Sequence, residues 1–211
     1  MSDDRPGRRS IRLRGRDYAL GGEYFVTICT RGRRFLFEDA RLRALAREVW
    51  EDLPRRFPDH VRLDAFVVMP NHVHGIIAIV PPGAIVLGTP NGEAVRGYGD
   101  DGMGVMNDAP TRPGAMNRAP TCADRERAPL GEVVRTFKAV VTREARKAGH
   151  TRFGWQRGYY EHIIEDADAF HAIRWYMEEN PNRWAQDSEN PHGKPDLRER
   201  MFLERIRSRL V

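Results

Sequence analysis

The most restrictive feature of this sequence is a pair of apolar, β-branched segments that almost touch along the chain. Residues 61–69 and 72–80 are rich in valine and isoleucine, and only Pro70-Asn71 lies between them. Segments of this composition favour strands, and Pro-Asn is typical of a turn. The sequence therefore predicts a tight antiparallel hairpin over residues 61–80.

Two histidines begin the second strand of this hairpin, with Val73 between them. A strand alternates its faces, so His72 and His74 point to the same side. Two imidazoles on one face, in otherwise apolar surroundings, are half of a metal site. The alternative is a pair of core histidines, each satisfied by its own hydrogen bond.

Apolar periodicity predicts further elements around the hairpin. The strand patterns are at 23–30 and 159–164, and the helix patterns are at about 39–55, 130–148 and 167–179. With the stretch 81–128 left out, the order is strand, helix, strand, strand, helix, strand and a final helix. That order is the split βαβ, ferredoxin-like arrangement. The predicted fold class is therefore α+β, with an antiparallel four-stranded sheet, helices on one face and an additional C-terminal helix.

Residues 81–128 differ in composition from the rest of the chain. They are rich in proline and glycine, and Met-Asn-x-Ala-Pro-Thr occurs at 106–111 and again at 116–121. These units have little to bury, so we expect a disordered insertion. We predict a basic N-terminal segment at 1–17, one domain at 18–184 that the insertion interrupts, and a charged tail at 185–211 with an amphipathic pattern from 197 to 210.

Composition limits the cellular context. The 211 residues contain no run near the roughly 18 apolar residues of a membrane span, so no membrane partner is expected. The basic N-terminus lacks the apolar core of a secretory signal. The two cysteines lie in very different contexts, which argues against a disulfide and favours a reducing cytoplasm. We therefore expect a cytoplasmic protein.

Arginines gather where an anionic polymer could bind. The net charge of +5 is modest, but six arginines fall within the first sixteen residues, and three more follow the first predicted strand. Clustered arginine is typical of surfaces that bind phosphate backbones. A solvated basic tail explains the N-terminal cluster equally well.

The last predicted helix adds chemistry to the histidines. Tyr176 and Asn180 are four residues apart and share a helical face. A phenol can attack phosphorus when a metal polarises the phosphate, and two imidazoles with an amide oxygen could hold Mg²⁺ or Mn²⁺. Alternatively, Tyr176 is a half-buried packing residue, and Asn180-Pro181 is an ordinary helix stop.

The ordered set of motifs resembles the REP-associated tyrosine transposases of bacteria, within the single-tyrosine, His-hydrophobe-His transposase superfamily. The resemblance spans about residues 8–184 apart from the insertion. It is carried by Arg9-Ser10-Ile11-Arg12-Leu13, Tyr24 to Thr30, Val68-Met69-Pro70-Asn71-His72-Val73-His74, Leu130 to Val134, Phe137-Lys138, Trp155-Gln156-Arg157, Tyr160-Glu161-His162 and Tyr176-x-x-x-Asn180-Pro181.

This resemblance implies a ferredoxin-like enzyme that nicks single-stranded DNA, often near a hairpin, and transfers the strand through a 5′-phosphotyrosine. It implies that His72, His74 and Asn180 hold Mg²⁺ or Mn²⁺, and that Tyr176, on the C-terminal helix, is the nucleophile. The implied partner is single-stranded or hairpin DNA in the bacterial nucleoid, and the implied assembly is a monomer or a homodimer.

Several assignments have alternatives. Tyr159 and Tyr160 are rival nucleophiles, ranked below Tyr176. A non-catalytic module that binds hairpin DNA or RNA, or a metal phosphoesterase that uses water, would fit the same residues. Among the DNA-contact candidates, Trp155 could instead anchor the core and His162 could be a satisfied sheet histidine. These candidates are Arg9, Arg12, Arg14, Arg135, Lys138, Trp155, Arg157 and His162.

Overall fold

The structure is a computed structural model that describes residues 21–58, 60–80 and 130–208. The predictions for the basic segment 1–17, with Arg9, Arg12 and Arg14, lie outside the described residues. The predicted insertion 81–128 lies outside them as well.

Four strands form one antiparallel sheet in the order β2-β3-β1-β4. This is the ferredoxin-like strand order, and it confirms the predicted α+β fold with its split βαβ connectivity. The strands are β1 (Gly22–Cys29), β2 (Val61–Val68), β3 (His72–Ile79) and β4 (Tyr160–Ile164).

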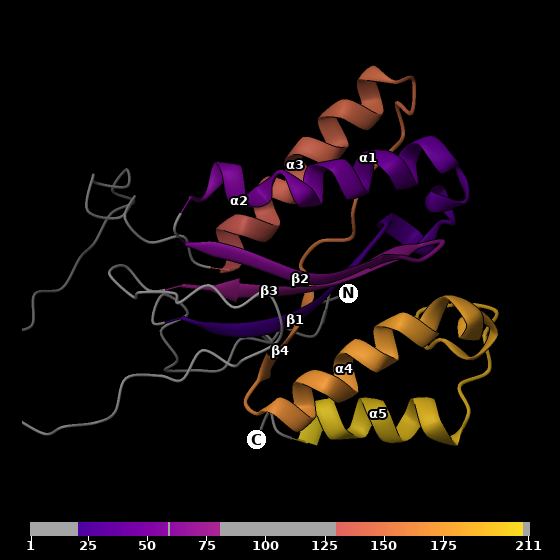
Figure 1. Ribbon diagram of the computed structural model, residues 1–211. Coiled ribbons are helices and arrows are strands. Elements are labelled where there is room, and N and C mark those ends of the chain that lie inside the picture. Colours follow the sequence, from indigo (N-terminus) through magenta and orange to yellow (C-terminus); the bar gives the residue numbers. More distant parts are fainter. Residues whose placement is uncertain (1–20, 59, 81–129, 209–211) are drawn as a thin grey trace, which may run out of the picture.

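Helices cover both faces of the sheet (Figure 1). The helices α1, α2 and α3 lie on one face, while α4 and α5 lie on the other. Their bounds are α1 (Ala40–Glu51), α2 (Leu53–Arg56), α3 (Leu130–Lys147), α4 (Ala167–Glu179) and α5 (Leu197–Ser208), with 3-10 turns at Arg31–Arg33, Leu36–Glu38 and Asn180–Gln186. No helix in the described ranges is long and apolar enough to cross a bilayer.

The helix predicted over 39–55 is divided into α1 and α2. Proline has no backbone N–H, so Pro54 cannot donate to the carbonyl oxygen four residues earlier. Pro54 instead occupies the first turn of the short α2, where proline is tolerated. The last turn of α1 ends with the N–H of Asp52, which donates to the carbonyl oxygen of Glu48.

Alternation along β1 divides the interior into two clusters. Tyr24, Val26 and Ile28 face α1 and α3 and join the large core, which includes Trp50 and Phe137. Phe25, Thr27 and Cys29 point to the opposite face, where a smaller apolar cluster packs under α4 and α5. Polar side chains next to this smaller cluster are consequently buried without being part of the main core.

The segment after residue 184 folds against the α4 face of the sheet. The predicted amphipathic helix is present as α5, and its Phe202 stacks on Tyr176 with ring centroids 3.8 Å apart. The segment that precedes α5 buries Asp187 beside the β2–β3 hairpin. The domain boundary at 184 remains a prediction. Residues beyond it contact the rest of the domain, since Phe202 stacks on Tyr176 and Asp187 lies beside His72 and His74.

Gly75 leads to a stability prediction. A Cβ at this position on β3 would overlap the indole ring of Trp50, a buried residue of α1. We expect Gly75→Ala to lower the free energy of unfolding by about 1–3 kcal/mol, because overpacking forces ring and backbone shifts. Urea unfolding measures the change. In the Trp50→Leu background the same substitution should cost clearly less, and equal costs in the two backgrounds would contradict this contact.

Candidate metal centre and active site

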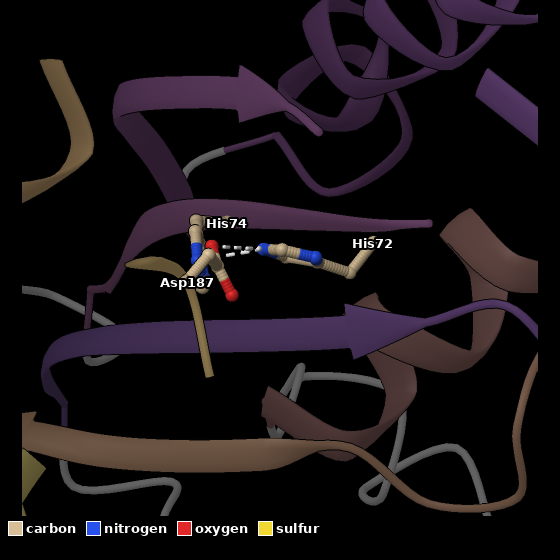
Figure 2. A group of neighbouring side chains, drawn as sticks. All are labelled: His72, His74 and Asp187. Atoms are coloured by element: carbon tan, nitrogen blue, oxygen red, sulfur yellow. Dashed lines mark hydrogen bonds and ion pairs between the residues drawn. The ribbon is translucent and has the colours of Figure 1, made fainter. Parts of the chain in front are cut away.

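Two histidines and one aspartate converge in the interior between β3 and the turn that follows α4 (Figure 2). The potential ligand atoms of His72, His74 and Asp187 all lie within 4.8 Å of one another. All three residues are at most 3% exposed. Strand alternation places the two imidazoles on one face, as predicted, and the chain returns more than a hundred residues later to bring the carboxylate to them.

The neighbours of His72 determine which of its ring nitrogens is protonated. The side-chain nitrogen of Asn71 donates to the backbone oxygen of Glu189 at 2.7 Å, which leaves the Asn71 Oδ1 as an acceptor. That oxygen lies 2.7 Å from His72 Nδ1, so Nδ1–H donates to it. The lone pair of His72 Nε2 is therefore directed into the cluster, as a metal ligand requires.

The ring of His74 lies between the sheet and α4. Its Nδ1 is 2.8 Å from the hydroxyl of Thr27, and its Nε2 is 2.9 Å from His72 Nε2. The amide of Asn180 is 3.2 Å from the same Nε2. Rotation of that amide by half a turn would present its oxygen to the cluster instead, since the two orientations have the same shape.

Burial determines the protonation of the ligands. It lowers the pKa of His72 well below its ordinary value and the pKa of His74 to about 3, so both rings are neutral near neutral pH. Burial, reinforced by the nearby charge of Glu199, raises the pKa of Asp187 to about 7. Neutral imidazoles are the form that binds metals, and a bound cation would favour the ionised carboxylate.

The donor set fits a cation. Asp187 Oδ2 is buried without a hydrogen-bond partner among the described residues, and it lies 3.6 Å from His72 Nε2. Two imidazole nitrogens and a carboxylate oxygen that converge in this way could hold a divalent metal ion. Asp187 was missed by sequence reasoning because it lies in an aperiodic polar stretch with no local signal for a ligand.

Tyr176 lies next to this cluster on α4. Its ring centroid is 5.7 Å from that of His74, and its hydroxyl donates to Glu199 Oε1 at 3.2 Å. Burial raises the pKa of Tyr176, and the charges of Asp187 and Glu199 raise it further. The phenol is therefore protonated, and a buried carboxylate on α5 is within hydrogen-bond distance of its proton.

The two rival tyrosines lie in different environments. Tyr160 is 42% exposed, and it lines the same small pocket of about 80 Å³ as His74 and Tyr176. Tyr159 packs instead against the large core. His162 is buried opposite Phe25 on β1. The structure thus brings together His72, His74, Tyr176 and Asn180, and leaves Tyr159 on the other side of the sheet.

The described DNA-contact candidates occupy different environments. Arg135 is exposed and pairs with Glu132, while Arg157 is exposed on the segment before β4. Lys138 donates to two backbone oxygens of that segment. Trp155 is 7% exposed and packs in the core, so its position matches the anchoring alternative and leaves no ring face for a base.

No family model matches the chain. A Haemophilus influenzae (strain Rd) protein, described as an uncharacterized protein, is 36% identical over 188 residues, which cover 85% of this chain and 91% of the relative. The chain belongs to the family of that protein.

Two solved structures are also similar to this chain. One is a REP-associated tyrosine transposase bound to a REP hairpin, with 19% identity, a TM-score of 0.49, and coverage of 80% of this chain and 72% of that chain. The other, from Deinococcus radiodurans R1, is described as a candidate transposase, with 17% identity, a TM-score of 0.39, and coverage of 79% and 95%.

Proposed function

We propose that this protein is a metal-dependent transposase-type enzyme that nicks single-stranded DNA and transfers the strand through Tyr176. The observation that carries the proposal is the placement of a half-buried phenol beside a buried His72–His74–Asp187 group. Asn180 lies between them, one helical turn from Tyr176 and 3.2 Å from His74 Nε2. Such a convergence of ligands and a nucleophile is the arrangement that phosphoryl transfer needs.

Four side chains would hold the divalent cation in this proposal: His72, His74, Asp187 and, after rotation of its amide, Asn180. A bound Mg²⁺ or Mn²⁺ supplies positive charge to the phosphate and to the oxygen that leaves it. Asn71 and Thr27 keep the two imidazoles in orientation through their hydrogen bonds. Asp187 is a ligand that the sequence motifs alone did not suggest.

In the proposed reaction the phenol of Tyr176 is the nucleophile. The hydroxyl oxygen of Tyr176 attacks the phosphorus of a phosphodiester, and the bond from phosphorus to the 3′ oxygen breaks. The phenolic proton moves to the carboxylate of Glu199, and the departing 3′ oxygen takes a proton from water. The product is a 5′-phosphotyrosine and a free 3′-hydroxyl. Attack by another 3′-hydroxyl reverses the step, so strand transfer needs no nucleotide triphosphate.

The role of Glu199 gives a prediction. Glu199→Gln keeps the shape of the side chain but cannot take the proton, so we expect adduct formation with DNA to slow by about 10²-fold. The pH dependence of the remaining rate should shift toward higher pH. Single-turnover kinetics measure both effects. Glu204→Gln, an exposed position on the same helix, is the matched control. An unchanged or faster rate in Glu199→Gln would show that this contact does not serve proton transfer.

One experiment separates the proposal from its two alternatives. The protein is incubated with an end-labelled hairpin DNA that carries single-stranded flanks, in Mn²⁺ and in EDTA, and the products are resolved under denaturing conditions. The proposal predicts a Mn²⁺-dependent covalent protein–DNA adduct. Cleavage without an adduct would indicate a phosphoesterase that uses water, and binding without cleavage would indicate a non-catalytic module.

A further inference from the structure

A basic cleft lies outside the metal centre. It measures about 860 Å³ and opens between α3 and the segment 153–158. Arg31, which begins the 3-10 turn after β1, also lines it. None of the described residues that line it is acidic, and none belongs to the metal group. Its cationic lining consists of Arg31, Lys138, Arg143, Arg146, Lys147 and Arg157.

Four of these six cations lack a carboxylate partner among the described residues, and one of the four, Lys138, donates to backbone oxygens instead. Arg143 and Lys147 both pair with Glu144. Within the ranges that the structure describes, Arg31, Arg146 and Arg157 form no ion pair with an acidic side chain. Three unneutralised guanidinium groups around one concave surface repel each other and attract an extended anion.

The walls of the cleft are fixed by hydrogen bonds between its own elements. Lys138 Nζ donates to the backbone oxygens of Gln156 and Gly158 at 2.7 and 2.8 Å, and the indole N–H of Trp155 donates to the Lys138 carbonyl. Arg146 donates to the carbonyl oxygen of Phe153. The segment 153–158 is thereby held against α3, so the cations are presented on a formed surface before any ligand binds.

The spacing and the surface chemistry favour a phosphodiester backbone. Lys138, Thr142 and Arg146 are four residues apart on α3, and they span about 12 Å along the helix, the axial distance of three or four phosphates on one strand of a duplex. The one aromatic residue that lines the cleft among the described residues, Trp155, is buried and offers no ring face for stacking. A cleft with cations and without a stacking surface contacts backbone rather than unpaired bases.

We propose that the cleft between α3 and residues 153–158 binds the sugar–phosphate backbone of the paired stem of a DNA hairpin. The inference rests on the proposed function for the identity of the polymer. The guanidinium groups of Arg31, Arg146 and Arg157 contact the phosphates, and Lys138 holds the wall with its remaining N–H directed to the ligand.

The cleft is connected to the metal centre by a short covalent and hydrogen-bonded path. The N–H of Gln156 donates to the Cys29 carbonyl, and Thr30 pairs with Trp155 in an isolated bridge. The N–H of Thr30 in turn donates to the carbonyl oxygen of Asn71, whose side chain orients His72. A stem held in the cleft therefore lies next to the end of the β2–β3 hairpin that carries the metal ligands.

The test measures binding without cleavage, so its outcome is separate from that of the proposed reaction. The Tyr176→Phe protein is titrated in EDTA with a fluorescent DNA hairpin of fully paired stem over a range of salt concentrations. We expect the combined Arg146→Gln and Arg157→Gln substitutions to weaken binding at least about tenfold and to lower the slope of log affinity against log salt by about 1.8. Arg157→Gln alone, at an exposed side chain, should lower the slope by about 0.9.

The matched control is Arg47→Glu, an exposed position on α1 that does not line the cleft. It should leave the slope unchanged, and thermal melting shows whether each variant is folded. A parental slope and affinity in the folded cleft variants would overturn the proposal. An equal loss of affinity for a single-stranded thymidine oligonucleotide would overturn the assignment to a paired stem.

Discussion

The Tyr176→Phe variant is expected to form no covalent adduct with DNA, with a loss of cleavage of at least about 10³-fold. Only the hydroxyl is removed, and the ring keeps its stacking on Phe202 and its edge contact with Phe25. The fold should therefore be retained, as judged by circular dichroism and thermal melting. Adduct formation on denaturing gels, with labelled hairpin DNA and Mn²⁺, measures the effect.

The other tyrosines near the site are the matched controls for this result. Tyr160→Phe removes a hydroxyl from the pocket that also contains His74, and Tyr159→Phe removes one from the opposite side of the sheet. Both variants should still form the adduct. If Tyr160→Phe abolished it and Tyr176→Phe did not, the assignment of the nucleophile to α4 would be wrong.

The second large effect is expected from His74→Ala, which removes the imidazole at the centre of the cluster. We expect Mn²⁺-dependent cleavage to fall by about 10²-fold or more and Mn²⁺ affinity to weaken by about 10–100-fold, because the buried site loses one of its two nitrogen ligands. Calorimetric titration of Mn²⁺ measures the affinity independently of cleavage. His171→Ala, at an exposed position on α4, is the control and should leave both quantities unchanged.

Two further variants distinguish the oxygen ligands in the same titration. Asp187→Asn removes a carboxylate that has no hydrogen-bond partner for its Oδ2 among the described residues. Asn180→Ala removes an amide that contacts His74. We expect the larger loss of Mn²⁺ affinity from Asp187→Asn, because a charged ligand is removed. Parental Mn²⁺ affinity in all three ligand variants would contradict a metal centre at this position.

The fold was largely predictable because its elements have strong local signals. The apolar runs of the hairpin, the pattern of β1 and the stripe of α3 each indicate one type of element, and their order leaves few topologies. The prediction of one continuous helix over 39–55 was wrong at Pro54, where the structure has two helices. The sequence shows the proline, but it does not show whether packing continues the helix beyond it.

The site was predictable only in part. His72 and His74 share a strand face, and Tyr176 and Asn180 share a helix face, so local periodicity groups each pair. Nothing local indicates that Asp187 and Glu199 join them, because both lie in a charged stretch where acidic residues are ordinary. Their roles depend on how α5 packs on α4, which is a long-range property. The burial of Trp155 also depends on long-range packing, so no local pattern in the sequence indicates it.

The residue that becomes covalently linked to DNA is the most direct test of the proposed function. After incubation with hairpin DNA and Mn²⁺, the adduct is digested with nuclease and protease, and the peptide that carries the remaining nucleotide is sequenced by tandem mass spectrometry. We expect a 5′-phosphonucleotide on Tyr176. A nucleotide on Tyr159 or Tyr160, or cleaved DNA with no modified peptide, would contradict it.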